Sequence, residues 1–210
     1  MELIHVYNVL LKSHGSQNWW PSKTGSKFEI CIGAILTQNT SWNNVDRALN
    51  NLIKAKAMNA KRISKMNTRT LQSIIKPSGF FRQKALRLKG FSNFVLGFGS
   101  VKKFLNNVTR EQLLDINGIG PETADSMLLY ACGKPYFVVD AYTKRIFSAL
   151  GMLNGHDYEE TRELFEHGLP KDVQLYKEYH ALIVRHSKEC CRGFTKDGCI
   201  LRSLVTGRLT

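Results

Sequence analysis

A helical spacing of apolar residues runs through nearly the whole chain and limits the folds that it can adopt. Stripes with the spacing i, i+3, i+4, i+7 lie within residues 45–53, 124–131 and 175–183. Residues 28–36 are apolar on nearly every side, which predicts a short helix in the middle of a bundle. No hairpin signal and no sustained alternation of apolar and polar residues is present. We therefore predict an all-α protein of about ten short helices.

The charge balance indicates a polyanionic partner. The chain has 30 lysines and arginines against 17 acidic residues, a formal net charge of +13. Such a charge favours DNA, RNA or an acidic membrane surface, although a basic but otherwise ordinary enzyme is the alternative. The sequence has no apolar stretch long enough to span a membrane and no signal peptide pattern. We expect a cytoplasmic protein, associated with the nucleoid if the cell is prokaryotic.

The sequence Ile-Asn-Gly-Ile-Gly-Pro at residues 116–121 lies between two predicted helices. Gly118 and Gly120 allow a tight turn and the close approach of another backbone, and Pro121 suits the first turn of a helix. Glycine amides at the amino end of a helix form a site for an anion such as a DNA phosphate. An ordinary turn between two helices is the alternative interpretation.

Asp140 lies twenty residues after Gly120 and directly before a helix predicted over residues 141–147. This position predicts an N-cap, which is by itself a sufficient reason for an aspartate. A carboxylate at a helix N-terminus also stays ionised at neutral pH, because amide donors and the helix dipole favour the charge. Near a phosphate-binding hairpin, such a carboxylate could stabilise a cation that develops on a sugar.

The hairpin and the Val-Val-Asp sequence that ends at Asp140 resemble the helix-hairpin-helix DNA glycosylases of the endonuclease III superfamily. Residues 35–40 and 79–85 are similar to the two loops with which that family probes the duplex. The resemblance covers most of the chain. It implies two helical domains with the active-site cleft between them, and Asp140 as the catalytic aspartate.

The resemblance also implies the domain boundaries and the DNA contacts. A six-helix domain that ends in the hairpin motif would span residues 22–133, and residues 1–21 with 134–210 would form the second domain. Gln38 matches the residue that fills the gap left by a flipped base, and Phe80 matches an apolar wedge. The implied DNA-binding residues are Gln38, Asn39, Phe80, Arg82, Lys84, Gly118, Ile119 and Gly120, of which the basic ones would hold phosphates without reading the sequence.

The chain departs from the family pattern at Glu122. Bifunctional members carry a lysine at this position, whose amine attacks the sugar and forms a Schiff base. A glutamate cannot do so, and neither Lys134 nor Lys144 occupies the family's position. We therefore predict a monofunctional glycosylase, which removes a base with water and leaves the strand intact.

A glutamate at this position resembles the 3-methyladenine DNA glycosylase branch. Trp19 and Trp20 resemble an aromatic wall of that branch's base pocket, Trp42 matches an aromatic on the other side, and Glu122 would add an acidic partner. An alkylated purine is cationic, so stacking on indoles adds about 0.5–2 kcal/mol of cation–π attraction. We predict excision of flipped-out alkylated purines such as 3-methyladenine. Core packing of the tryptophans, and a dipole role for Glu122, are the alternatives.

The C-terminal cysteines match an incomplete cluster site. Many relatives hold a [4Fe–4S] cluster through four cysteines. Here Cys191 and Cys199 match two ligand positions, and Lys196 and Val205 stand at the other two. We therefore expect no cofactor and a degenerate cluster loop near residues 190–205. The alternatives are reduced cysteines packed as small apolar residues, and a zinc site formed by His186, Cys190, Cys191 and Cys199.

Three other functions stay open at this point. An endonuclease III-like glycosylase and lyase for oxidised pyrimidines would need the lysine that is absent. A mismatch adenine glycosylase would carry a glutamate where Gly33 stands. A non-catalytic DNA-binding module would have kept only the hairpin. In each case we expect a monomer that binds double-stranded DNA and no membrane; for the enzymes, that DNA contains damaged or mismatched bases.

Overall fold

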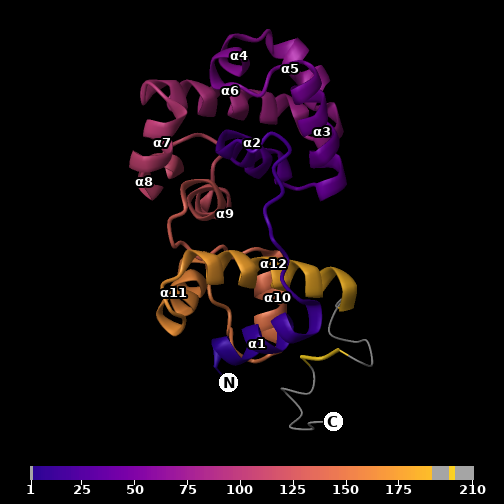
Figure 1. The fold of residues 1–210 in the computed structure, drawn as a ribbon, viewed down its shortest axis with the longest axis vertical. Helices are drawn as coiled ribbons and strands as arrows, with labels where there is room; N and C mark the ends of the chain where they lie inside the picture. The colour runs from indigo at the N-terminus through magenta and orange to yellow at the C-terminus, as the bar shows by residue number, and fades with distance from the viewer. Residues whose placement is uncertain (1, 191–198, 202–210) are drawn as a thin grey trace. The chain divides into compact units, whose positions relative to one another are not determined.

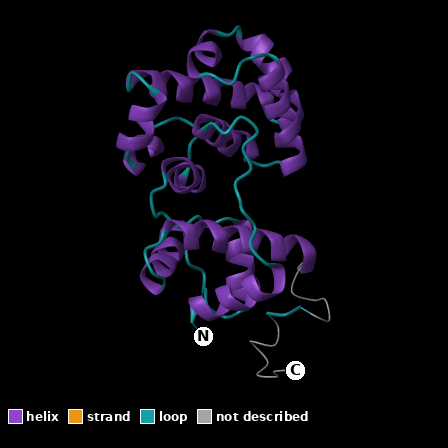
Figure 2. Cartoon of the chain, viewed as in Figure 1, coloured by secondary structure: helices purple, strands orange, loops and turns teal. Residues whose placement is uncertain are grey.

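The structure is a computed structural model that describes residues 2–190 and 199–201. These residues form twelve α-helices and no strand, which confirms the all-α prediction (Figure 2). The number exceeds the expected ten because very short helices, such as Ala60–Lys65 and Arg110–Leu114, are too brief to show a full apolar stripe. No helix in the described part of the chain has the length and apolar character needed to cross a bilayer.

The chain forms two compact units, and it passes from one to the other between Pro21 and Ser22 and between Gly133 and Lys134 (Figure 1). We call residues Ser22–Gly133 the hairpin unit, and the described residues on either side of it the terminal unit. The hairpin unit contains eight α-helices, α2 to α9, where six were expected.

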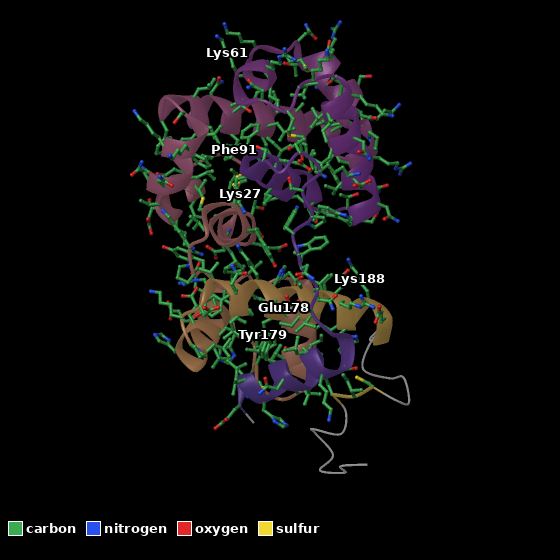
Figure 3. The ribbon with its side chains drawn as sticks, viewed as in Figure 1. Lys27, Lys61, Phe91, Glu178, Tyr179 and Lys188 are labelled. Carbon is green, nitrogen blue, oxygen red and sulfur yellow. The ribbon has the colours of Figure 1, made fainter. Side chains whose placement is uncertain are left out.

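The hairpin unit is built around α2. Its elements are α2 (Lys27–Thr37), α3 (Trp42–Lys54), α4 (Ala60–Lys65), α5 (Thr68–Ile75), the 3-10 helix η1 (Lys76–Ser78), α6 (Phe81–Gly97), α7 (Val101–Asn107), α8 (Arg110–Leu114), α9 (Pro121–Ser126) and the π-helix η2 (Met127–Cys132). Every residue of α2 from Phe28 to Leu36 is buried, as the sequence predicts. Phe91 of α6 stacks on Phe28 with 6.1 Å between ring centroids (Figure 3). The carboxyl end of α2 is therefore held inside a packed core.

The terminal unit joins residues from both ends of the chain. Its helices are α1 (Leu3–His14), α10 (Ala141–Ala149), α11 (Tyr158–Gly168) and α12 (Val173–Cys190). Aromatic rings form its core: Phe137 stacks on Phe165 with centroids 4.2 Å apart, and Phe147 meets Phe165 edge-on at 4.7 Å. The buried hydroxyl of Tyr179 donates to the Leu3 carbonyl at 2.7 Å, which ties α12 to α1 (Figure 3).

Candidate active site

Asp140 caps the amino end of α10, as the sequence predicts. Its Oδ1 accepts a hydrogen bond from the backbone N–H of Thr143 at 2.7 Å and another from the Thr143 hydroxyl at 2.9 Å. Its other oxygen, Oδ2, lies 3.5 Å from Nε2 of His180. The carboxylate is thus held on both oxygens, while its side chain is only 12% exposed.

The surroundings of Asp140 keep its carboxylate charged. Burial raises its pKa, but the hydrogen bond and charge of His180 and the two hydrogen bonds from Thr143 lower it by more, so that the pKa of Asp140 lies below its usual value. An ionised carboxylate that is nearly shielded from water attracts an adjacent cation strongly, because little solvent screens the interaction.

His180 was missed by the sequence reasoning. It lies forty residues after Asp140, is 7% exposed, and reaches the carboxylate because α12 packs against α10. No local motif marks it, since a contact between two distant helices leaves no spacing pattern in the sequence. His180 holds Oδ2 and helps to keep the carboxylate ionised, while Thr143 holds Oδ1.

The helix-hairpin-helix motif consists of α8, the turn that follows it, and α9. Arg110 of α8 and Asp125 of α9 form a buried ion pair, with Nε 2.7 Å from Oδ1 and Nη2 3.1 Å from Oδ2. A two-point contact of this kind fixes orientation as well as distance. The two helices of the motif are therefore locked together from within.

The turn itself requires glycine at position 118. Gly118 has a φ of +83°, and a Cβ atom there would lie 2.2 Å from Nε of Arg87. Ile119 is 4% exposed, and its N–H donates to the carbonyl of Ile116 at 3.0 Å. Ile119 therefore serves the structure of the turn, and the DNA contacts predicted at Gly118 and Gly120 stay a prediction.

Gln38 follows α2 and connects that helix to the hairpin. Its Nε2 donates to the Gly118 carbonyl and to Oγ1 of Thr123, both at 2.9 Å, and its Oε1 accepts from Nη1 of Arg87. The amide that was predicted to enter the duplex is thus engaged with the hairpin in this structure. Entry into the duplex, which stays a prediction, would require it to leave these partners.

Two exposed loop residues have a left-handed backbone. Asn39 has a φ of 53° and Phe80 a φ of 43°, and Phe80 is 60% exposed. A non-glycine residue in this region is uncommon, and such strained positions concentrate at functional sites. Arg82 is exposed in the first turn of α6. An exposed aromatic ring beside a cation suits an apolar wedge next to a phosphate contact.

Lys84 does not have the role predicted for it. The residue is 1% exposed, and its Nζ donates to the carbonyls of Leu36 at 2.8 Å and Ser78 at 2.7 Å. Burial and the nearby charge of Arg87 lower the pKa of Lys84 to about 8. It cannot reach a phosphate from there, so the prediction is wrong. Its spacing of seven residues from the buried Phe91 was the signal that it faces the core.

The four residues predicted to surround the base come from both units. Trp19 and Trp20 follow α1 in the terminal unit, half-buried, with ring centroids 5.4 Å apart. In the hairpin unit, Trp42 begins α3 and is half-buried, and Glu122 is exposed in the first turn of α9. None of the three tryptophans, all of which the structure describes, is a buried core residue. Their assembly into one pocket stays a prediction.

Comparisons with known proteins agree with this geometry. Residues 32–171 match the family described as HhH-GPD superfamily base excision DNA repair protein. The chain belongs to the HhH-GPD superfamily. A protein of Methanocaldococcus jannaschii described as a DNA repair glycosylase is 48% identical over 199 residues, which are 91% of this chain and 90% of the relative.

Solved structures of other HhH-GPD-like proteins share this fold. The 3-methyladenine DNA glycosylase MagIII of H. pylori, bound to 1,N6-ethenoadenine, has a TM-score of 0.80 and 34% identity, and the match covers 91% of this chain and 100% of that one. Endonuclease III in a non-covalent complex with DNA has a TM-score of 0.79 over 95% of this chain and 92% of that one. At 18% identity, the second likeness concerns the fold alone.

The predicted cluster remnant of this HhH-GPD protein is only partly described. Cys191 lies outside the described residues, and Cys199 is buried with Sγ 3.5 Å from Nε2 of His186. Burial and the nearby His14 lower the pKa of His186 to about 4, so the ring is neutral at pH 7. In the part of the chain that the structure describes, no group of three or more His, Cys, Asp or Glu could hold a metal ion. Three of the four matched ligand positions, Cys191, Lys196 and Val205, lie outside the described residues, so the absence of a cluster stays a prediction.

Proposed function

We propose that this base excision repair glycosylase is monofunctional and hydrolyses the N-glycosidic bond of alkylated purines, such as 3-methyladenine, in duplex DNA. The ionised and nearly buried carboxylate of Asp140 carries the proposal. An oxocarbenium-like transition state places positive charge on the sugar, and a fixed carboxylate stabilises that charge. The 34% identity to MagIII supports alkylated purines as the substrate class.

Hydrolysis of this bond needs few catalytic groups besides Asp140. An alkylated purine is cationic, so it leaves as a neutral base when the bond between C1′ and nitrogen breaks and its electron pair goes to the base. Asp140 stabilises the resulting sugar cation and orients the water whose oxygen then bonds to C1′, and this water releases a proton to the solvent. With Glu122 in place of the family's lysine, no Schiff base forms at that position, and the product is an abasic site in an unbroken strand.

The hairpin unit supplies the proposed DNA contacts. The amides of Gly118 and Gly120 and the exposed Arg82 would hold phosphates, and the exposed Phe80 would separate the base step. The net charge of +13 adds an attraction that falls with salt. Selectivity would come from base flipping, which is easiest for a damaged base, and from the fit in the pocket. We propose that no iron–sulfur cluster takes part.

Incubation with methylated duplex DNA, analysed with and without hot alkali, tests the proposal. We expect release of a methylpurine and strand breaks only after alkali treatment. Breaks without alkali, or a borohydride-trapped adduct with DNA, would mean a lyase and would contradict the monofunctional assignment. Release of oxidised pyrimidines in place of methylpurines would move the substrate to the endonuclease III class. Tight binding without any base release would leave a DNA-binding module.

A further inference from the structure

The ammonium group of Lys84 lies where two helices end. Leu36 is the penultimate residue of α2, and Ser78 is the last residue of η1. The last carbonyls of a helix have no partner within that helix, and the negative end of the dipole favours a cation beside them. The two carbonyls that accept hydrogen bonds from Nζ, at 2.8 and 2.7 Å, therefore form a site that suits a buried ammonium group.

The segments that leave these two helix ends are the predicted DNA-probing loops. Gln38 and Asn39 follow α2, and Gly79 and Phe80 follow η1. Lys84 also holds the second loop through its backbone, because its N–H donates to the Phe80 carbonyl at 3.0 Å. The left-handed backbone of Asn39, Gly79 and Phe80 begins within three residues of the carbonyls that Nζ binds.

We propose that Lys84 is a positioning residue that links the two probing loops, so that Gln38 and Phe80 enter the duplex together at a fixed separation. The side chain touches no DNA in this role. It sets the distance between the wedge and the residue that fills the gap. The use of the loops in base flipping rests on the proposed function, whereas the link between the loops does not.

Hydrogen exchange tests the link without DNA. Lys84→Met removes the ammonium group and keeps the length of the side chain. The amides of Thr40 and Gly79 are hydrogen-bonded to the carbonyls of Thr37 and Lys76, both at 3.2 Å, and report on the two loops. We expect both amides to lose protection together, by about tenfold or more, in this variant. Loss at only one amide, or at neither, would overturn the proposal.

Lys89→Met is the matched control. Lys89 lies on the same helix, is half-buried, and also donates from Nζ to a backbone carbonyl, that of Met66. Its removal should leave the exchange of Thr40 and Gly79 unchanged. If Lys84→Met fails to fold, Lys84→Gln takes its place: its amide can satisfy one buried carbonyl, but its side chain is one atom shorter and should not hold both, so both amides should still lose protection.

Excision from two duplexes tests the use of the link. One duplex carries the methylated purine opposite a partner base, and the other carries it without a partner in a bulge, where no pairing has to be broken. We expect Lys84→Met to slow single-turnover release about tenfold or more on the paired lesion and less than about twofold on the bulged one, because flipping costs more in the first. Equal slowing on both would make Lys84 merely structural. If the wild type releases nothing from either duplex, the proposed function fails, and the exchange experiment still decides the link.

Discussion

Two buried ionisable groups, one in each unit, have pKa values shifted in the same direction, but the shift has opposite effects on their charges. The pKa values of Asp140 in the terminal unit and of Lys84 in the hairpin unit are both lowered. For the carboxylic acid, a lower pKa means that the fold favours the charged form. For the amine, it means that the fold disfavours the charged form.

The difference lies in what surrounds each group. Asp140 is met by N–H and O–H donors and by a histidine, so its hydrogen bonds outweigh its burial. Among the described residues, the Lys84 ammonium group is met by two carbonyls and repelled by Arg87, so burial prevails. The fold therefore stabilises the charge of Asp140, whereas it only tolerates the charge of Lys84. Substitutions of Asp140, Lys84 and His180 test this contrast.

The largest effect is expected from Asp140→Asn. The variant removes the charge and keeps a side chain that can cap α10, so base release should fall about a thousandfold, within the range of a positioned catalytic group, while DNA binding persists. Single-turnover release and a gel-shift titration measure the two. Asp157→Asn is the control, because Asp157 caps α11 in the same unit with its Oδ1 2.9 Å from the Glu160 amide. Loss of binding together with activity would make Asp140 a structural cap only.

The next effect is the pH dependence of stability that Lys84 causes. Its pKa is about 8 in the folded protein and 10.5 in the unfolded chain, so between these values the unfolded chain binds a proton that the folded protein lacks. The free energy of unfolding should therefore rise with pH in this window, by on the order of 3 kcal/mol from this group. Urea unfolding at pH 7 and pH 10.5 gives the value once the change in Lys84→Met is subtracted. An equal pH dependence in the two proteins would show that the ammonium is not disfavoured.

Gly118→Ala should destabilise the hairpin by about 1–2 kcal/mol, because alanine is strained at a φ of +83°. The new Cβ also displaces Arg87 from its place on Gln38, so affinity for undamaged duplex should fall as well. Thermal unfolding and a binding titration measure both changes. Gly120→Ala is the control for stability, since a Cβ there meets nothing within 4 Å and φ is −91°. If the two variants behaved alike, the turn would not depend on the conformation of Gly118.

The smallest effect is expected from His180→Gln. Without the hydrogen bond and charge of His180, the pKa of Asp140 rises, so the acid limb of the pH–rate profile should move to higher pH. Release at pH 5 should fall about fivefold, and release at pH 8 should change little, as for a lost charge-assisted hydrogen bond. His167→Gln, at an exposed histidine of α11, should leave the profile unchanged. A loss that is uniform across pH would assign His180 to packing alone.

The sequence by itself determined the features that depend on near neighbours along the chain. The apolar spacing predicted the helices, including α2 with its buried residues 28–36, because a helix repeats every few residues. The cap at Asp140 was predictable for the same reason, since its partner Thr143 is three residues away. The glycine at position 118 also carried its own signal, because its backbone conformation excludes a side chain.

Tertiary structure alone decided the features that join distant segments. His180 reaches Asp140, Arg87 closes over Gly118, and Gln38 binds the hairpin only because helices far apart in sequence pack together. For Lys84, the spacing along α6 indicates the inner face of the helix, but only the packing shows which carbonyls its ammonium group reaches. As a letter among basic residues it predicted a phosphate contact, but its position on the inner face of α6 buries it beneath the ends of α2 and η1. The residue type determines the charge, whereas the fold determines whether that charge is exposed to water and which groups it contacts.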